Sequence, residues 1–173
     1  MASYYYLIAS LPTLTADGDL PLDYATFLNM CKSNVSEETY QLLEGLTLSS
    51  SEGPLVDEWS VFYGSLMREL NYQRSLRLGK PYSRVYEKDP ISASVAASAI
   101  AAENPLAAER ILLDYEFSYL DSLVALHTFD DYVLFGYAIK LKLLERMHCF
   151  EHEKGQAEFQ RLFEQVQQRV FSL

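Results

Sequence analysis

The densest run of apolar residues along the chain extends from Asp130 to Met147. So few polar positions interrupt it, chiefly Lys140 and Lys142, that it predicts a helix set deep in a core. Asp130 is a residue type that caps helix N-termini, and we expect the helix to end near Phe150. Because apolar side chains cover most of its circumference, we expect other helices to surround it.

A second long helix is predicted directly before this run, over residues 105–126. Asn104 is a good capping residue, and Pro105 is favoured at the first helical position. Apolar side chains again cover most of the circumference, so this helix is also expected to be central. The intervening turn at 127–130 is short, and the two helices are therefore predicted to pack against each other as a hairpin.

Two shorter helices are predicted near the start of the chain. Residues 21–32 begin with proline, which helices favour at their first position, and Asp19 or a neighbour is placed to cap them. Residues 36–46 begin with a capping serine and carry glutamates in the first turn, where the helix dipole favours negative charge. Residues 4–11 are apolar but too short for periodicity to separate a helix from an extended edge segment.

The longest predicted helix follows the polar loop at 47–53. It covers residues 54–78 and ends at Gly79, a typical helix terminator. Its apolar side chains recur at three-and-four spacing and form one inward stripe of Leu55, Trp59, Phe62, Tyr63, Leu66, Met67 and Leu70.

The remaining segments complete an all-α pattern. Residues 80–91 are a connector with a proline near each end, residues 92–103 a helix of small side chains, and residues 155–171 a last helix with one apolar face. We predict an irregular bundle of six or seven helices around a central helical hairpin. It is expected to form a single domain over residues 1–173, with a subdivision near 79–91 as the alternative.

Composition and charge narrow the classes of function. The 173 residues are 49 % hydrophobic and 22 % charged, as in globular proteins, and the net charge is −10. A negative surface repels phosphate backbones and anionic lipids, so we expect no nucleic-acid partner. No run approaches the roughly 20 apolar residues that a membrane helix needs, so direct membrane insertion is not expected. Two cysteines, Cys31 and Cys149, and no basic signal region favour a reduced, cytoplasmic protein.

Residues 68–88 reverse this charge locally. They hold six basic and two acidic groups, a local +4 in a chain of −10. Basic groups interleaved with tyrosines can bind nucleic acid, but protein interfaces are enriched in the same residues, and the overall charge favours a protein partner. The residues expected to contact an acidic partner are Arg68, Tyr72, Arg74, Arg77, Lys80, Tyr82 and Arg84. The alternative is that Arg74 and Arg77 only complement the helix dipole before Gly79.

Motifs of nucleotide sites and of common hydrolases are absent from the sequence, which contains no G-x-G-x-x-G, Walker A, G-x-S-x-G or C-x-x-C pattern. His148 and His152 would share a helix face and are weak candidates for a metal site. The glutamate between them is not placed as in H-E-x-x-H, and a zinc site needs three or four converging ligands. We therefore expect two exposed histidines, with no metal and no cofactor.

Carboxylates on residues 105–126 are the remaining candidates for chemistry. Asp114, Glu116 and Asp121 lie among apolar residues, which can raise a carboxyl pKa. Asp114 and Asp121 are seven residues apart and share a helix face, so a pocket beside them would suit a small-molecule-binding protein or an enzyme. Structural ion pairs with Arg110 or with the lysines of the next helix are the interpretation that we favour.

Four stretches of the chain resemble a family of uncharacterised bacterial proteins whose genes lie among those of V-type ATPase subunits. They are SYYYLIASLPTL (3–14), NYQRSLRLGKPY (71–82), YLDSLVALHTFDDYVLFGYAIKLKLLER (119–146) and KGQAEF (154–159). Through this operon association, the resemblance implies a cytosolic accessory or structural part of a V-type ATPase or ATP synthase. The helical character and the tyrosine-rich start are also distantly similar to the all-helical socket protein between the rotor ring and the central stalk of V-type ATPases. No functional residue transfers from that socket protein.

These observations predict a protein that acts by contact with other proteins and performs no catalysis. The expected role is an accessory or structural subunit, or an assembly factor, of a bacterial V-type ATPase or ATP synthase. It would be cytoplasmic and would reach the inner membrane only through the ATPase complex. The alternative is a small-molecule-binding protein or enzyme that uses a carboxylate-lined pocket near Asp114 and Asp121.

Overall fold

The computed structural model describes residues 4–82 and 88–148, together with 161 and 163. The helices in this part of the chain are α1 (Tyr5–Ser10), α2 (Tyr24–Cys31), α3 (Glu37–Glu44), α4 (Val56–Arg77), α5 (Pro90–Ala101), α6 (Pro105–Val124) and α7 (Asp131–His148). These seven helices, with no strand among the described residues, confirm the all-α prediction. None of the helices within the described ranges is long and apolar enough to cross a bilayer. The helix predicted over 155–171 lies outside those ranges, apart from Arg161 and Phe163, which are helical.

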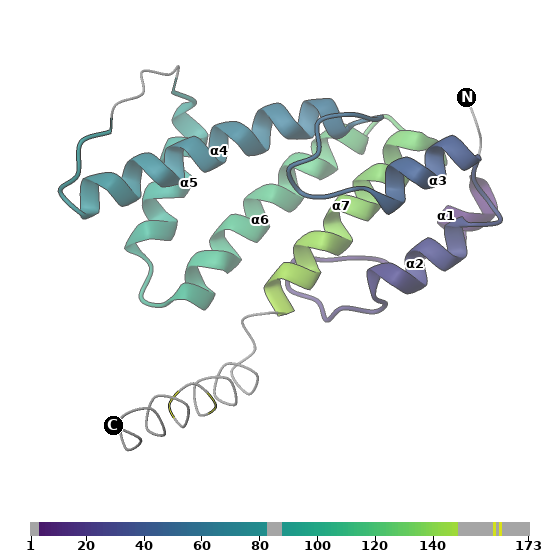
Figure 1. Cartoon of the computed structure of the whole chain (residues 1–173), viewed down its shortest axis with the longest axis horizontal. Coiled ribbons are helices and arrows are strands. Elements are labelled where there is room, and N and C mark those ends of the chain that lie inside the picture. The colour runs from purple at the N-terminus through teal and green to yellow at the C-terminus, as the bar shows by residue number, and fades with distance from the viewer. Residues whose placement is uncertain (1–3, 83–87, 149–160, 162, 164–173) are drawn as a thin grey trace, which may run out of the picture.

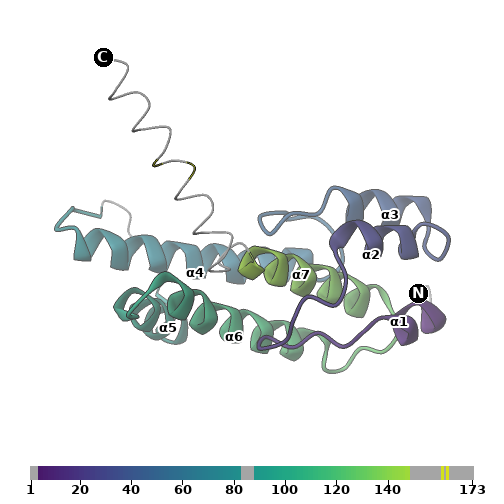
Figure 2. The ribbon, with the colours of Figure 1, turned by 90° about the horizontal axis from the view of Figure 1, so that it is seen from below.

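The arrangement places α6 and α7 side by side through the middle of the molecule (Figure 1). At one end α5 packs against both α4 and α6, and toward the other end α2 packs against α3 and α7. In the perpendicular view, α4 runs in a separate layer from α5 and α6 (Figure 2). The α1 helix lies at the opposite end of the molecule from the last turn of α4 in both views.

The α7 helix forms the centre of the core, as its apolar sequence predicts. Its buried residues are Leu134, Phe135, Gly136, Ala138, Ile139, Leu141, Leu143 and Leu144. The buried side chains that join them in one hydrophobic cluster come from all six other helices. Gly136 allows α7 to approach α6, because a Cβ atom there would lie only 2.8 Å from Cγ1 of Val124. The short turn between the two helices therefore closes a tightly packed pair.

Three predicted helix caps are confirmed. Ser36, Asn104 and Asp130 each accept a hydrogen bond from the backbone amide three residues further on, at 3.1, 2.8 and 3.2 Å. Such bonds satisfy amides that lack an intrahelical partner at a helix start. These side chains therefore fix where α3, α6 and α7 begin.

The start of α2 differs from the prediction. The helix begins at Tyr24, not at Pro21, and its cap is Asp23, not Asp19. The carboxylate of Asp23 accepts the amide of Thr26 at 2.7 Å. Hydrogen bonding from the side chain of Thr26 and then from this amide lowers the pKa of Asp23. Aspartate is a stronger start signal than proline here because it supplies the acceptor that the free amides of the first turn require.

The starts of α4 and α5 also differ from the prediction. Asp89 and Pro90 do not belong to the predicted connector but cap and begin α5, and the carboxylate of Asp89 accepts the amide of Ser92 at 2.8 Å. The same pair, a capping residue followed by proline, begins α6. The start of α5 could therefore have been predicted from the sequence. The α4 helix begins at Val56, two residues later than predicted, because Leu55 has a left-handed backbone with φ of 66°.

Candidate partner-binding surface

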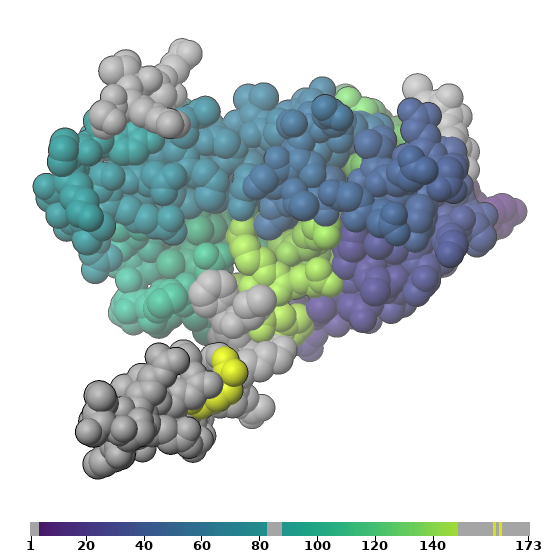
Figure 3. All heavy atoms as spheres, viewed as in Figure 1, coloured from purple at the N-terminus to yellow at the C-terminus, as the bar shows by residue number. Residues whose placement is uncertain are grey.

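The basic residues at the end of α4 lie where this helix stops abruptly. Gly79 has a φ of +63°, its amide donates to the carbonyl of Leu76 at 3.1 Å, and the amide of Lys80 donates to the carbonyl of Ser75 at 2.9 Å. This pair of bonds is a Schellman motif, in which glycine adopts the left-handed conformation without a steric penalty. The motif stops α4 where it projects at one end of the molecule, on the left in Figure 3.

The predicted contact cations divide into two kinds. The side chains of Arg68, Arg74 and Lys80 are exposed and make no hydrogen bond or ion pair with the residues that the structure describes. Arg77 is also exposed, but its Nη1 donates to the carbonyl of Ile100 at 2.6 Å. That carbonyl lies in the last turn of α5, where carbonyls lack an intrahelical donor. Arg77 therefore tethers α5 to α4, and the other three cations remain available to a partner.

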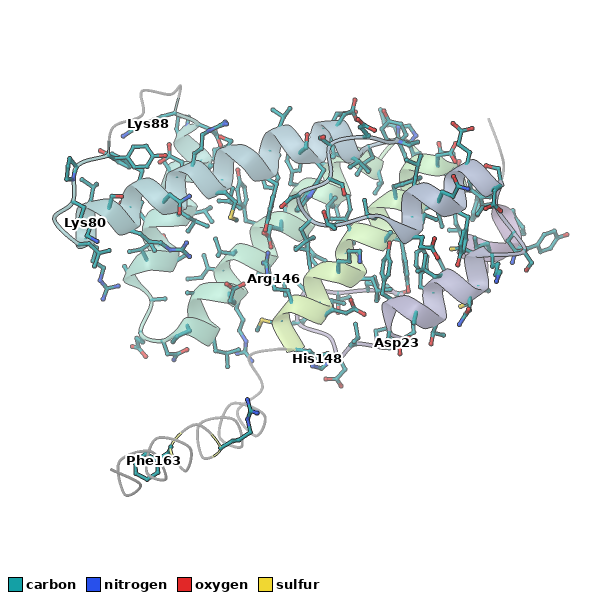
Figure 4. The ribbon with its side chains drawn as sticks, viewed as in Figure 1. Asp23, Lys80, Lys88, Arg146, His148 and Phe163 are labelled. Carbon is teal, nitrogen blue, oxygen red and sulfur yellow. The ribbon has the colours of Figure 1, made fainter. Side chains whose placement is uncertain are left out.

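The predicted tyrosines are half-buried against the same end of α4. The rings of Tyr72 and Tyr82 meet edge to face with centroids 5.6 Å apart, and Nζ of Lys88 lies 4.1 Å from the centroid of Tyr72. Figure 4 places Lys80 and Lys88 at this end of the molecule. The edge-to-face contact holds Tyr82, and the cation–π contact holds Lys88, against Tyr72 of α4. The last predicted contact residue, Arg84, lies outside the described residues.

Two leucines at the end of α4 are exposed, which was not predicted from the sequence. Leu76 is 55 % exposed and Leu78 is 67 % exposed, although both side chains are fully aliphatic. Both lie beyond the predicted apolar stripe, which ends at Leu70. Helical spacing gave no signal for Leu76, because it comes seven residues after Glu69 and so falls on the same face of the helix. Apolar side chains exposed within a charged rim are typical of protein contact sites.

Glu69 was also missed and lies beneath this surface. Its side chain is completely buried, and neither carboxylate oxygen accepts a hydrogen bond from the described part of the chain. Glu69 comes seven residues after Phe62, so the helical spacing places it on the buried face of α4. Burying an unpartnered carboxylate is unfavourable, and this position therefore weakens the packing of α4.

The candidate carboxylates of α6 do not share one pocket. Asp121 forms an ion pair with Nζ of Lys140 at 2.5 Å, which confirms the predicted pairing with a lysine of the next helix. It borders a depression of about 290 Å³. Asp114 borders a separate depression of about 580 Å³, together with Arg110, His148 and the turn at residues 16–20. A ligand in either depression would therefore meet one of the two aspartates.

The third carboxylate, Glu116, belongs to a buried ionic cluster. Arg146 of α7 contacts it through two parallel bonds, Nη1 to Oε1 at 3.2 Å and Nη2 to Oε2 at 2.6 Å. The same Nη2 lies 3.2 Å from Oε2 of Glu109, and Figure 4 shows Arg146 between the helices at the middle of the molecule. Burial raises the pKa of Glu116, although the charge of Arg146 opposes that shift. The cluster joins α6 to α7 and lines neither of the two depressions.

Of the two candidate metal ligands, the structure describes only His148. His148 is the last residue of α7 and lies half-buried beside the larger depression, so the prediction that it is exposed was wrong. His152 lies outside the described residues. Within the described ranges, no three His, Cys, Asp or Glu side chains are grouped so that they could hold a metal ion. Cys31 is buried in the core, where its environment raises the pKa of the thiol to about 12.

Comparisons of the chain with the models of known protein families, with curated proteins and with solved structures find no match. We therefore infer function from these residues and from the family resemblance of the four stretches of sequence. Among the sites in the described residues, the end of α4 combines exposed cations, exposed leucines and two tyrosines in edge-to-face contact. We call Arg68, Arg74, Leu76, Leu78 and Lys80 the cationic end.

Proposed function

We propose that this chain is a non-catalytic accessory or structural subunit, or an assembly factor, of a bacterial V-type ATPase or ATP synthase. It acts by protein–protein contact, and the cationic end binds an acidic surface of the complex. The sequence resemblance supports the choice of complex. The three cations of the cationic end, whose side chains have no partner within the described residues, support the mode of action. The protein would be cytoplasmic and would meet the inner membrane through the complex alone.

The observation that carries this proposal is the contrast between the cationic end and the rest of the chain. A protein with a net charge of −10 keeps Arg68, Arg74 and Lys80 exposed without neutralising them within its described part. Long-range attraction would steer these cations toward an acidic partner. The exposed leucines would be buried away from water only when the partner makes contact. Both effects favour recognition by a protein surface, because nucleic acid is repelled by the remaining charge.

The direct test is affinity capture from the native cell with the full chain as bait, followed by mass identification of what binds. Wild-type bait is expected to retain V-type ATPase subunits. The double reversal Arg74→Glu with Lys80→Glu is expected to lower their recovery at least tenfold, as for two rim charges that become repulsive. Both side chains are exposed, so the fold should tolerate the change.

The matched control is Lys32→Glu with Arg110→Glu, which alters the net charge equally at exposed positions away from the cationic end. It should leave recovery unchanged. Equal recovery with both double variants would show that the cationic end is not the contact surface. Absence of ATPase subunits from the wild-type capture would remove the proposed complex itself.

A second candidate function is small-molecule binding, which the depression of about 580 Å³ beside Asp114 favours. Arg110 and Asp114 would present opposite charges to a ligand there, and Leu106, Leu144 and Met147 supply apolar walls. Screening metabolites by thermal shift against the wild type and Asp114→Asn would test it. A stabilising compound whose effect is lost in Asp114→Asn would support this function, and a screen without such a compound would leave the contact role as the better proposal.

A further inference from the structure

The end of the molecule opposite the cationic end carries exposed aromatic side chains. Tyr5 is 52 % exposed and Tyr6 84 % exposed. The ring of Tyr5 lies 4.7 Å from that of Phe129 and 5.3 Å from that of Tyr6, centroid to centroid. The amide of Tyr4 donates to the carbonyl of Phe129 at 2.7 Å, so α1 is fastened to the turn between α6 and α7. The three rings therefore form one continuous, positioned patch.

The surroundings of this patch are acidic. The hydroxyl of Tyr4 donates to Asp131 at 2.8 Å, and it lies near Thr39 in the first turn of α3. That turn exposes Glu37 and Glu38, against one lysine, Lys32, at the end of α2. We call Tyr5, Tyr6, Phe129, Glu37 and Glu38 the aromatic end. Its charge is opposite to that of the cationic end, and tyrosine is among the side chains enriched at protein interfaces.

The two surfaces cannot meet within one molecule. The α4 helix alone has 22 residues, a length of about 33 Å, and the aromatic end lies beyond its start (Figures 1 and 2). Between two molecules they can meet, because each copy offers one surface of either kind. The exposed leucines of one copy would then lie against the tyrosines of the next, within a rim of opposite charges.

We propose that the protein associates with a second copy of itself head to tail, the cationic end of one copy docking on the aromatic end of the next. Contact between two cationic ends would oppose like charges, and so would contact between two aromatic ends, through Glu37 and Glu38. Only the mixed pairing brings opposite charges together. A head-to-tail interface leaves one surface of each kind unused, so association continues into a ring or an open chain.

The proposal is tested with the purified full chain by sedimentation velocity over a range of concentrations. The wild type is expected to gain mass with concentration, and raising the salt from about 0.05 to about 0.5 M should reverse this, because exposed charges are screened. Arg74→Glu with Lys80→Glu, and separately Tyr6→Ser with Glu37→Lys, should each lower the association constant at least tenfold. All four side chains are exposed. Circular dichroism of each variant is the control that its helices are kept.

Mixing the two variants distinguishes head-to-tail pairing from other dimers. The Arg74/Lys80 variant keeps its aromatic end and the Tyr6/Glu37 variant keeps its cationic end, so the mixture should form a one-to-one dimer and nothing larger. A wild type that stays monomeric up to its solubility limit would overturn the proposal, as would a variant that associates normally alone or a mixture that stays monomeric. The measurement uses no ATPase component, so its result is independent of the proposed function.

Discussion

Replacing Arg146 by methionine is expected to destabilise the protein by about 3 kcal/mol. Arg146 makes two bonds to Glu116, whose side chain is completely buried, and lies 3.2 Å from Glu109. Removing one partner of a buried pair typically costs about 3–5 kcal/mol, because the other charge is left without compensation. The side chains of Arg146 and Glu109 are 24 % and 20 % exposed, so water screens part of the charge that is left. The lower end of that range therefore applies.

The loss should depend on pH. Burial holds the pKa of Glu116 above its ordinary value of 4.5, so the folded protein binds this proton more tightly than the unfolded chain. In the window between 4.5 and the raised pKa, the free energy of unfolding contributed by Glu116 therefore increases as pH falls. Without Arg146 the pKa rises further. The difference between Arg146→Met and wild type should accordingly shrink from about pH 7 to about pH 5.

The assay is urea unfolding followed by the fluorescence of Trp59, the one tryptophan in the sequence, which is fully buried. A loss of about 3 kcal/mol corresponds to a fall of about 6–12 °C in Tm for a chain of this size. The control is Arg146→Met combined with Glu116→Leu, which should recover much of the loss because the uncompensated charge is gone. A loss below about 1 kcal/mol, or a loss that does not vary with pH, would refute the reasoning.

Three further predictions follow from single residues. Glu69→Leu should raise the free energy of unfolding by about 1–3 kcal/mol in the same urea assay, because it removes a buried carboxylate without a hydrogen-bond partner in the described chain; a decrease would reveal a partner for Glu69. Asn104→Ala should cost about 1 kcal/mol by removing the cap of α6, and Asn104→Ser should restore most of it; equal stability of the two variants would contradict a capping role. In a Cys149→Ser background, Cys31 should resist a thiol reagent near pH 8 until urea unfolds the chain, because burial raises its pKa to about 12; rapid labelling of the folded protein would disprove the burial.

The proposed contact surface was only partly predictable from the sequence. The excess of basic residues was visible at once, because charge is a property of composition. Which of those cations are available is a tertiary property: Arg77 reaches the carbonyl of Ile100, 23 residues further on, and Arg74 does not. The exposed Leu76 and Leu78 likewise depend on how α4 ends at Gly79 and on what packs beside it.

The sequence by itself determined the helices of this protein. Apolar spacing and capping residues act within a few positions along the chain, so α7, its partner α6 and the caps at Ser36, Asn104 and Asp130 could be predicted. Even the missed start at Asp89 follows from a local pattern.

Only the tertiary structure decided which side chains meet across the chain. It joined Arg146 to Glu116, assigned Asp114 and Asp121 to separate depressions, and left Glu69 buried without a hydrogen-bond partner among the described residues. It also set the cationic and aromatic ends at opposite limits of the molecule. These relations depend on how helices pack in three dimensions, and a helical period predicts which face is buried but not what that face contacts.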